Sequence, residues 1–247
     1  MARYQIILAY DGSNLWGSQR QANRRTAQGE LETALRQLGW QGRSVLMAGR
    51  TDTGVHATGQ VAAFDLEWSH RPEELVKALN SHLPADLAVR GVKRTREDFH
   101  PRFDARSRRY RYRLYCQEVR DPLRERYAWR LWPPLHAEGL YAVAQLLHGT
   151  HDFAAFGTPP RPESSTIRTV MQAVWRQQDD EWTFEVEADA FLYRMVRRMV
   201  YLQVAVGQGK LAAQAIADVL ASKPGIVLPA GLAPAHGLTL LEVTYPE

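Results

Sequence analysis

The sequence predicts an α+β protein of two similar halves, with helices covering one face of an antiparallel sheet in each. Strand-like and helix-like segments follow one another as β-α-β-β-α-β in the first half, and a similar order returns in the second. Hydrophobic residues make up 45% of the 247 residues, enough for a substantial core. We therefore expect a first half at residues 1–105 and a second half at residues 106–247.

The elements of the first half have local signals. Residues 3–10 alternate and are rich in β-branched side chains, which predicts a strand. Residues 26–38 predict a helix because Leu31, Ala34, Leu35 and Leu38 share one face, and Gly39 follows as a cap. Pro72 begins a second helix, with two glutamates in its first turn. Further strands are expected at residues 44–47, 60–66 and 87–95.

The second half begins with a strand at residues 109–116 that has two unlike faces. One face carries Tyr110, Tyr112, Leu114 and Cys116, and the other carries Arg109, Arg111 and Arg113. Helices are expected at residues 136–148, 191–206 and 211–221, and strands at residues 167–177, 181–188 and 238–245. His151 and Asp152 match no standard zinc spacing, so we expect a capping role for them.

Composition limits the class of protein. The single cysteine, Cys116, excludes an internal disulfide framework and a cysteine-rich metal site, and it fits a reducing compartment. No apolar run approaches the length of a membrane span, and no signal-peptide core precedes the first strand. We expect a soluble cytoplasmic protein without a membrane partner.

Arginine is concentrated in one segment. Only four of the 31 basic residues are lysine. Between Arg90 and Arg113, nine arginines and one lysine face three carboxylates, a net charge of +7, whereas the rest of the chain sums to −3. Arginine binds phosphate through a planar fork and stacks on bases. A solvated charged face is the alternative, but the clustering favours a nucleic acid.

Three constellations could carry chemistry. The first is the loop Arg50-Thr51-Asp52-Thr53-Gly54 between two predicted strands. A carboxylate beside an arginine is favoured in its charged form and can act as a nucleophile or a base. Taken alone, however, residues 51–54 are typical of an ordinary turn.

The second constellation, residues 99–112, interleaves aromatic rings with arginines. Rings can stack on an unpaired base while guanidiniums hold phosphates, and Tyr110 offers a face to a base that has left its stack. The alternative is an amphipathic strand with tyrosines in the core. The third is the helix at residues 191–200, where Arg197 lies near the apolar edge and could pair with a carboxylate or a phosphate, whereas Arg194 is expected in solvent.

Other nucleotide signals are missing. Residues 207–210 lack the spacing of a phosphate loop, and no dinucleotide fingerprint is present. The glycine-rich aromatic motif of the common RNA-recognition module is also absent, which weakens a pure binding-module interpretation.

Together these segments resemble the bacterial tRNA pseudouridine synthase A family from the first strand to the last. The matching segments are YDGS (10–13), GSQRQ (17–21), QGELETAL (28–35), GRTDTGVHA (49–57), FHPRFDA (99–105), RYRY (109–112), HDF (151–153), MVR (195–197) and PAHGL (234–238). The resemblance implies two fused RRM-like (ferredoxin-like) halves with antiparallel sheets, the pseudouridine synthase fold, with a cleft between the halves.

The resemblance also implies a reaction, in which uracil is detached from ribose C1′, rotated and reattached through C5. Asp52 matches the catalytic aspartate, which attacks C6 or C1′ or assists glycal formation. Tyr110 matches the tyrosine that stacks on the target base, Arg197 a basic partner of the aspartate, and Arg50 an arginine that assists entry of the flipped nucleotide. Four further arginines are expected to bind RNA: Arg20, Arg102, Arg108 and Arg109.

The implied substrates are uridines at positions 38, 39 and 40 of the tRNA anticodon stem-loop. The implied assembly is a homodimer bridged by one tRNA, with neither a metal nor a small-molecule cofactor. The sequence departs from the family pattern at Leu15 and Ser18, where aromatics are usual, and at Arg198, where asparagine is common. We expect these departures to affect RNA docking rather than the chemistry.

Two alternatives remain open from the sequence. A non-catalytic RNA chaperone of the same fold would use the arginine patch without Asp52. An N-glycosidase acting on nucleic acid would also place an aspartate near a sugar C1′, but it would release free uracil.

Overall fold

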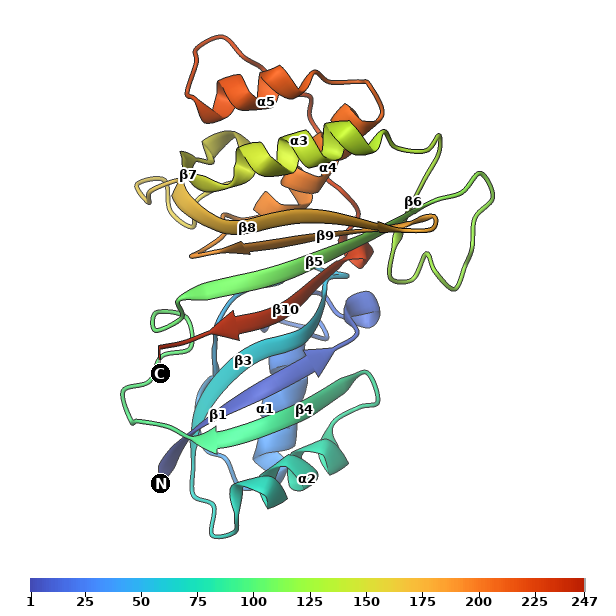
Figure 1. Cartoon of the computed structure of the whole chain (residues 1–247). Coiled ribbons are helices and arrows are strands. Elements are labelled where there is room, and N and C mark those ends of the chain that lie inside the picture. Colours follow the sequence, from blue (N-terminus) through green and yellow to red (C-terminus); the bar gives the residue numbers. More distant parts are fainter. Residues whose placement is uncertain (247) are drawn as a thin grey trace. The chain divides into compact units, whose positions relative to one another are not determined.

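The computed structural model describes residues 1–246 and divides into two compact units (Figure 1). The first unit contains Met1–Arg106 and the chain from Thr239 onward, and the second contains Ser107–Leu238. We expect the last strand in the second half from its place in the sequence, whereas in the structure its residues from Thr239 onward belong to the first unit.

The first unit is a largely antiparallel sheet with two helices. Its sheet order is β4-β1-β3-β10, with the short β2 also paired to β3. Figure 1 shows α1 passing behind β1 and β3. The elements are β1 (Ala2–Tyr10), α1 (Ala27–Gln37), β2 (Leu46–Met47), β3 (His56–Leu66), α2 (Pro72–His82), β4 (Leu87–Arg94) and β10 (Leu238–Thr244).

Local chemistry explains the helix starts in this unit. The Thr26 side chain accepts the Gly29 N–H at 3.2 Å and so caps α1, whose Leu31 and Leu35 are fully buried. Pro72 begins α2 as expected, and the Glu74 carboxylate accepts the N–H of Arg71 at 3.0 Å.

The last strand, β10, runs parallel to β3, with Thr239 opposite His56. A Cβ on Gly59 would lie 2.1 Å from the Leu241 carbonyl oxygen. Glycine at this position therefore permits the close approach of the two strands. A pairing between segments this far apart in the chain has no local signal, which is why the sequence did not reveal it.

The second unit has its own largely antiparallel sheet, in the order β5-β9-β8-β7, with β6 parallel to β5. Helix α3 packs on β8 and contacts both α4 and α5. The predicted α+β class with largely antiparallel sheets is confirmed. The elements are β5 (Ser107–Cys116), β6 (Trp129–Leu131), α3 (Ala137–Leu147), β7 (Gly149–Asp152), β8 (Ile167–Gln178), β9 (Glu181–Ala188), α4 (Met195–Gly207) and α5 (Ala213–Leu220).

Two local predictions in this unit have clear outcomes. The capping role expected of His151 and Asp152 is not confirmed, because the turn Ala154–Phe156 has Phe153 at its N-cap position and no side-chain cap. The Asp152 carboxylate accepts the Ala154 N–H at 2.9 Å from one residue earlier, and the His151 ring lies 2.9 Å from the His148 carbonyl oxygen. The helix expected from residue 191 begins only at Met195, so the earlier start was wrong. Tyr193 forms a bridge with Thr158, and Arg194 takes a left-handed φ of 65°, which ends the extended segment and begins the helix.

Candidate active site

Asp52 lies on a tight turn in the loop between β2 and β3 of the first unit. The Val55 N–H donates to the Asp52 carbonyl oxygen at 3.1 Å, and Gly54 supplies a φ of +80°. Asp52 is half-buried, and Arg50 is exposed. Residues 51–54 thus form an ordinary turn in their backbone, and this turn carries a half-buried carboxylate two residues after an exposed arginine.

Ser18 fixes the backbone next to Asp52. Its hydroxyl accepts the Thr51 N–H at 2.8 Å, and its own N–H donates to the Thr51 carbonyl oxygen at 3.1 Å. The Ser18 carbonyl oxygen in turn accepts the Gln28 N–H of α1 at 2.9 Å. Ser18 has no exposed surface. The residue before Asp52 is therefore tied, through Ser18, to the first turn of a helix.

A second buried network supports the same loop from the sheet. The Tyr10 hydroxyl and the Thr51 hydroxyl are 2.9 Å apart, and Gln60 donates to the Gly49 carbonyl oxygen at 3.0 Å. Burial raises the pKa of Tyr10, although its hydrogen bond with Thr51 opposes the effect. Tyr10 is therefore neutral at ordinary pH and acts only as a hydrogen-bonding support.

Leu15 and Gly17 complete this support. The Leu15 carbonyl oxygen accepts the Gly54 N–H at 3.4 Å, and Leu15 is only 2% exposed. A Cβ on Gly17 would lie 2.8 Å from the Thr51 carbonyl oxygen. The structure therefore places Leu15 and Ser18, which we expected to affect RNA docking, in the support of the Asp52 loop.

Tyr10 and Gln60 could not be identified as supports of the Asp52 loop from the sequence. The only available signal was their polar character at inward positions of strands that are otherwise apolar, since buried polar groups normally find partners.

Tyr110 lies on β5 of the second unit, opposite Val186 of β9. It is 9% exposed, and its ring meets that of Phe191 edge-on, with centroids 5.2 Å apart. The predicted division of this strand is confirmed for residues 109–114, where Tyr110, Tyr112 and Leu114 are buried and the arginines between them are half-exposed. It fails at the end of the strand, where Cys116 is half-buried and Tyr115, on the arginine face, is fully buried. The Tyr110 ring is held in place and keeps a small exposed surface.

Arg197 lies in the first turn of α4, in the same unit as Tyr110. Its Nε donates to the Ala233 carbonyl oxygen at 2.8 Å, and the Ala233 N–H donates to the Arg197 carbonyl oxygen at 3.2 Å. Arg198 donates to the Gly231 carbonyl oxygen at 3.0 Å, so both arginines tie residues 229–233 to the helix.

Tyr112 links the strand to the same segment. Its hydroxyl donates to the Pro234 carbonyl oxygen at 2.8 Å. Burial raises the pKa of Tyr112 well above its usual range, and the nearby positive charge of Arg197 opposes this effect without overcoming it. The hydroxyl is therefore a neutral donor that holds the chain beyond Ala233.

The arginine patch is partly neutralised within the second unit. Arg111 donates to Glu185 at 2.6 Å and Arg113 to Glu181 at 2.8 Å, both across the β5–β9 pair. The net charge of +7 counted along residues 90–113 therefore overstates the positive field of this strand, because the partners come from a strand distant in sequence.

The four arginines expected to bind RNA have different surroundings. Arg20 donates to the buried carboxylate of Glu32 at 2.6 Å and remains 47% exposed. Arg102 is exposed, Arg109 is half-buried, and Arg108 donates to the Asp189 carbonyl oxygen at 2.8 Å. Their contact with RNA stays a prediction.

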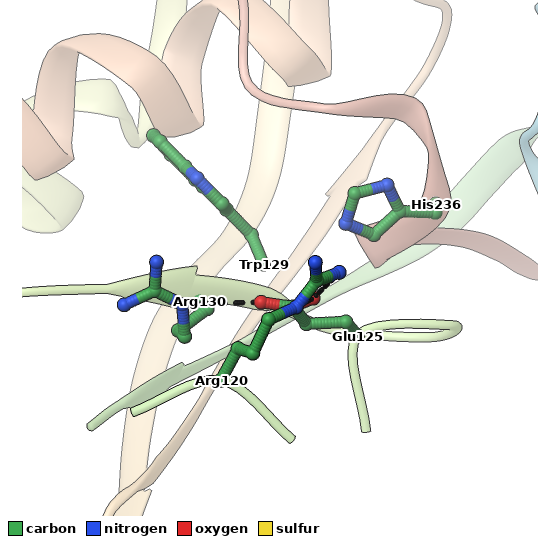
Figure 2. A pocket seen from close by; sticks show the side chains of 5 residues that line it. All are labelled: Arg120, Glu125, Trp129, Arg130 and His236. Carbon is green, nitrogen blue, oxygen red and sulfur yellow. Dashed lines mark hydrogen bonds and ion pairs between the residues drawn. The ribbon is translucent and has the colours of Figure 1, made fainter. Parts of the chain in front are cut away.

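A hollow of about 340 Å³ opens in the second unit (Figure 2). It is lined by Arg120, Glu125, Trp129, Arg130 and His236. Among residues 1–246, no group of three or more histidine, cysteine or acidic side chains is arranged to hold a metal ion. No helix of that described part is long and apolar enough to cross a membrane.

Asp52 and Arg50 thus belong to the first unit, and Tyr110 and Arg197 to the second. Comparison with known proteins relates these positions to a family. A model of the family described as tRNA pseudouridine synthase matches residues 6–104 and 143–246.

Curated relatives are similar over nearly the whole chain. A tRNA pseudouridine synthase A of Chloroflexus aurantiacus is 42% identical, covering 100% of this chain and 90% of the relative. Proteins of the same name from Limosilactobacillus fermentum and Geobacillus kaustophilus are each 40% identical, covering 99% of this chain and 96% and 95% of the relatives. The chain belongs to the tRNA pseudouridine synthase family.

Proposed function

We propose that Asp52 is the catalytic carboxylate with which this chain isomerises uridine to pseudouridine at positions 38, 39 and 40 of the tRNA anticodon stem-loop. Membership in the family makes the chain an isomerase that acts on tRNA. The observation that carries the role of Asp52 is its position on a turn whose backbone is fixed by Ser18 and Thr51. A preorganised carboxylate is what an attack on a buried sugar or base requires.

The reaction breaks the bond between N1 of uracil and C1′ of ribose and forms a bond between C5 and C1′. The hydrogen on C5 leaves as a proton, and N1 gains one. Asp52 acts as a nucleophile at C6 or C1′, or it assists formation of a glycal. All three routes need a charged carboxylate within reach of the nucleotide and no cofactor.

Tyr110 supplies the surface on which the uracil stacks in this proposal. The edge-on contact with Phe191 and the register with Val186 support this role, because they fix the plane of the ring. A flipped base needs such a platform to replace the stacking that it loses.

Arg197 supplies a positive charge in this proposal, as the partner of the Asp52 carboxylate. Its anchorage on Ala233 supports this role, since an arginine held by the backbone loses less freedom when it pairs with an anion. Arg50, exposed beside Asp52, assists entry of the nucleotide.

The proposal includes a homodimer bridged by one tRNA and a cytoplasmic location, where tRNA is available. Light scattering of the purified protein tests the assembly. A mass of twice 28.1 kDa is expected, and a mass of 28.1 kDa would contradict the dimer.

The role of Asp52 is tested by tritium release from a tRNA transcript labelled at C5 of uridine. Asp52→Ala should lower release by at least about a thousandfold, because the loss of a nucleophile removes the reaction path. Unchanged release by Asp52→Ala would refute the assignment, and no release from any tRNA by the unaltered protein would refute the activity.

The same reaction separates the alternatives by its products. Isomerisation leaves the mass of the RNA unchanged, whereas an N-glycosidase would give free uracil and an abasic site. A non-catalytic chaperone would retain its cellular effects after Asp52→Ala. Mapping of pseudouridine in the treated tRNA tests positions 38, 39 and 40, and modification elsewhere would contradict that assignment.

Tyr110→Phe divides the role of the ring from that of the hydroxyl. If the hydroxyl takes part in proton transfer, affinity for tRNA should be retained while kcat falls by about a hundredfold. A kcat equal to that of the unaltered protein would reduce Tyr110 to a stacking surface.

A further inference from the structure

The hollow in the second unit is built from two segments. Arg120, Glu125, Trp129 and Arg130 come from the connection after β5 and from β6 itself, and His236 comes from the PAHGL segment (234–238). The proposed chemistry uses none of these five side chains. Figure 2 shows them arranged around one opening, with the Glu125 carboxylate between the two guanidiniums.

The side chains that line the hollow carry a net positive charge. Glu125 accepts the Nε of Arg120 at 2.9 Å through one oxygen and the Nε of Arg130 at 3.1 Å through the other. The two guanidiniums and the one carboxylate sum to a charge of +1. A hollow of this charge favours an anion.

Both guanidiniums keep donors to spare. Arg130 also donates through Nη1 to the carbonyl oxygens of Gln117 and Glu118, at 3.3 and 3.0 Å. Within the described chain, Nη1 of Arg120 and Nη2 of Arg130 make no hydrogen bond.

Arg120 is not needed to anchor the connection between β5 and β6. Arg124 already anchors this connection, because it donates to Asp180 at 2.8 and 2.9 Å and its guanidinium lies 4.2 Å from the Tyr115 ring. Arg120 is 70% exposed, and Glu125 is its sole partner among the described residues. An exposed ion pair of this kind adds little stability.

Trp129 gives the hollow a flat wall. Its place is set by the parallel pairing of β6 with β5, where it lies opposite Leu114. Its ring also meets that of Tyr112 edge-on, with centroids 6.4 Å apart. Arginine donors beside a fixed indole are the combination that single-stranded and looped RNA favours, because phosphate and base are bound together.

We propose that this hollow binds one nucleotide of the tRNA other than the target uridine. Arg120 and Arg130 donate to the oxygens of a phosphodiester, and Trp129 packs against the adjoining ribose or base, while His236 lines the opening. The inference rests on the proposed function, because it takes tRNA as the ligand, and it adds a docking position outside the reacting nucleotide.

The test measures tRNA binding by proteins that also carry Asp52→Asn, so that no turnover disturbs the equilibrium. Arg120→Gln should weaken binding roughly tenfold at low salt, the effect of losing hydrogen bonds to a charged group. The plot of log Kd against log salt should also become shallower by about one, as expected for one lost phosphate contact. Arg130→Gln should act in the same direction.

Arg71→Gln is the matched control. The Arg71 side chain is 81% exposed, and its one ion pair among the described residues is a distant one with Glu74, at 4.0 Å. The Arg71→Gln substitution should leave both the Kd for tRNA and the salt slope unchanged. Arg120 is exposed, so its substitution should not alter the melting temperature, which is measured in parallel.

Equal affinity and equal salt slopes for Arg120→Gln and Arg71→Gln would overturn the inference. Because the unaltered protein is assayed for tritium release in the same series, the two failures can be told apart. Normal release with unaffected binding defeats the subsite alone, whereas no release from any tRNA defeats the proposed function.

Discussion

The Asp52 loop of the first unit and the Tyr110 strand of the second are held by different forces. Around Asp52 the supports are buried neutral hydrogen bonds from Ser18 and Tyr10, both on the preceding β1 or its following loop. Around Tyr110 the polar supports are ion pairs across the sheet, such as Arg111 with Glu185.

This difference indicates that the first region fixes the position of Asp52, whereas the second supplies positive charge. A buried neutral network has few alternative arrangements, because each unpaired group would lose a hydrogen bond without gaining water. Half-exposed ion pairs are weaker and more adaptable, and their arginines keep donors that an RNA phosphate can use. We expect changes near Asp52 to alter turnover and changes along the arginine strand to alter affinity.

Gly17→Ala should give the largest effect of the substitutions that test this difference. Gly17 has a φ of +88°, and a Cβ there would lie 2.8 Å from the Thr51 carbonyl oxygen. The backbone before Asp52 must therefore move, and a displacement of about 1 Å can lower turnover by roughly a hundredfold. Single-turnover tritium release measures the change.

Gly209→Ala is its control. Gly209 has a φ of +70°, but a Cβ there meets nothing within 4 Å. It should reproduce the backbone strain, about 1 kcal/mol of unfolding free energy, without a change in turnover. Equal turnover in the two variants would show that the Asp52 loop is not held through Gly17.

Ser18→Ala should have a smaller effect, a fall in kcat of about tenfold with KM nearly unchanged. It leaves the buried Thr51 N–H without its acceptor, which destabilises the native loop by about 1–3 kcal/mol. Steady-state kinetics on the tRNA transcript separate the two constants.

Ser81→Ala provides the comparison for Ser18→Ala, since Ser81 is exposed and its hydroxyl donates to the Ala78 carbonyl oxygen in its own helix. It should leave kcat unchanged. A Ser18→Ala protein with the kcat of Ser81→Ala, or with a raised KM alone, would contradict a positioning role.

Asp180→Asn should have the smallest effect, and it tests the stabilisation that an ion pair adds in the second unit. Hydrogen bonds from Arg124 hold the pKa of Asp180 below its usual value of 3.8. The lowered pKa means that its stabilisation is present above about pH 4 and is lost as the pH falls through the lowered value. At pH 7 the substitution should lower the free energy of unfolding by about 0.5 kcal/mol, because the carboxylate is partly exposed.

Urea unfolding at neutral pH and at about pH 2 measures this effect. The difference in the free energy of unfolding between Asp180→Asn and the unaltered protein should disappear in acid. Asp179→Asn, at the exposed neighbouring position, should have the same free energy of unfolding as the unaltered protein at both pH values. If Asp180→Asn remained less stable than the unaltered protein in acid, Asp180 would act through its shape rather than its charge.

Much of the fold could be predicted from the sequence because its signals are local. Thr26 and Pro72 mark helix starts through their own chemistry, and the alternation of Tyr110, Arg111 and Tyr112 predicts a strand with two unlike faces. The start of α4 could not be predicted, because it depends on the bridge between Tyr193 and Thr158.

The supports of the candidate site depend on contacts between distant segments. The bond from Thr51 to Ser18 joins residues 33 positions apart, and that from Arg111 to Glu185 joins residues 74 apart. Neither partner can be chosen before the loop packing and the β5–β9 register are known. Motif order therefore indicated Asp52, but not the groups that position it.

The catalytic role of the Asp52 carboxylate is best tested by Asp52→Asn, which keeps the size of the side chain and removes its charge. With a tRNA transcript carrying tritium at C5 of uridine, the unaltered protein and the control Asp98→Asn, at an 83% exposed position, should release tritium at equal rates. Asp52→Asn should retain tRNA binding and release tritium at least about a thousandfold more slowly. Release by Asp52→Asn at a rate close to that of Asp98→Asn would contradict the account.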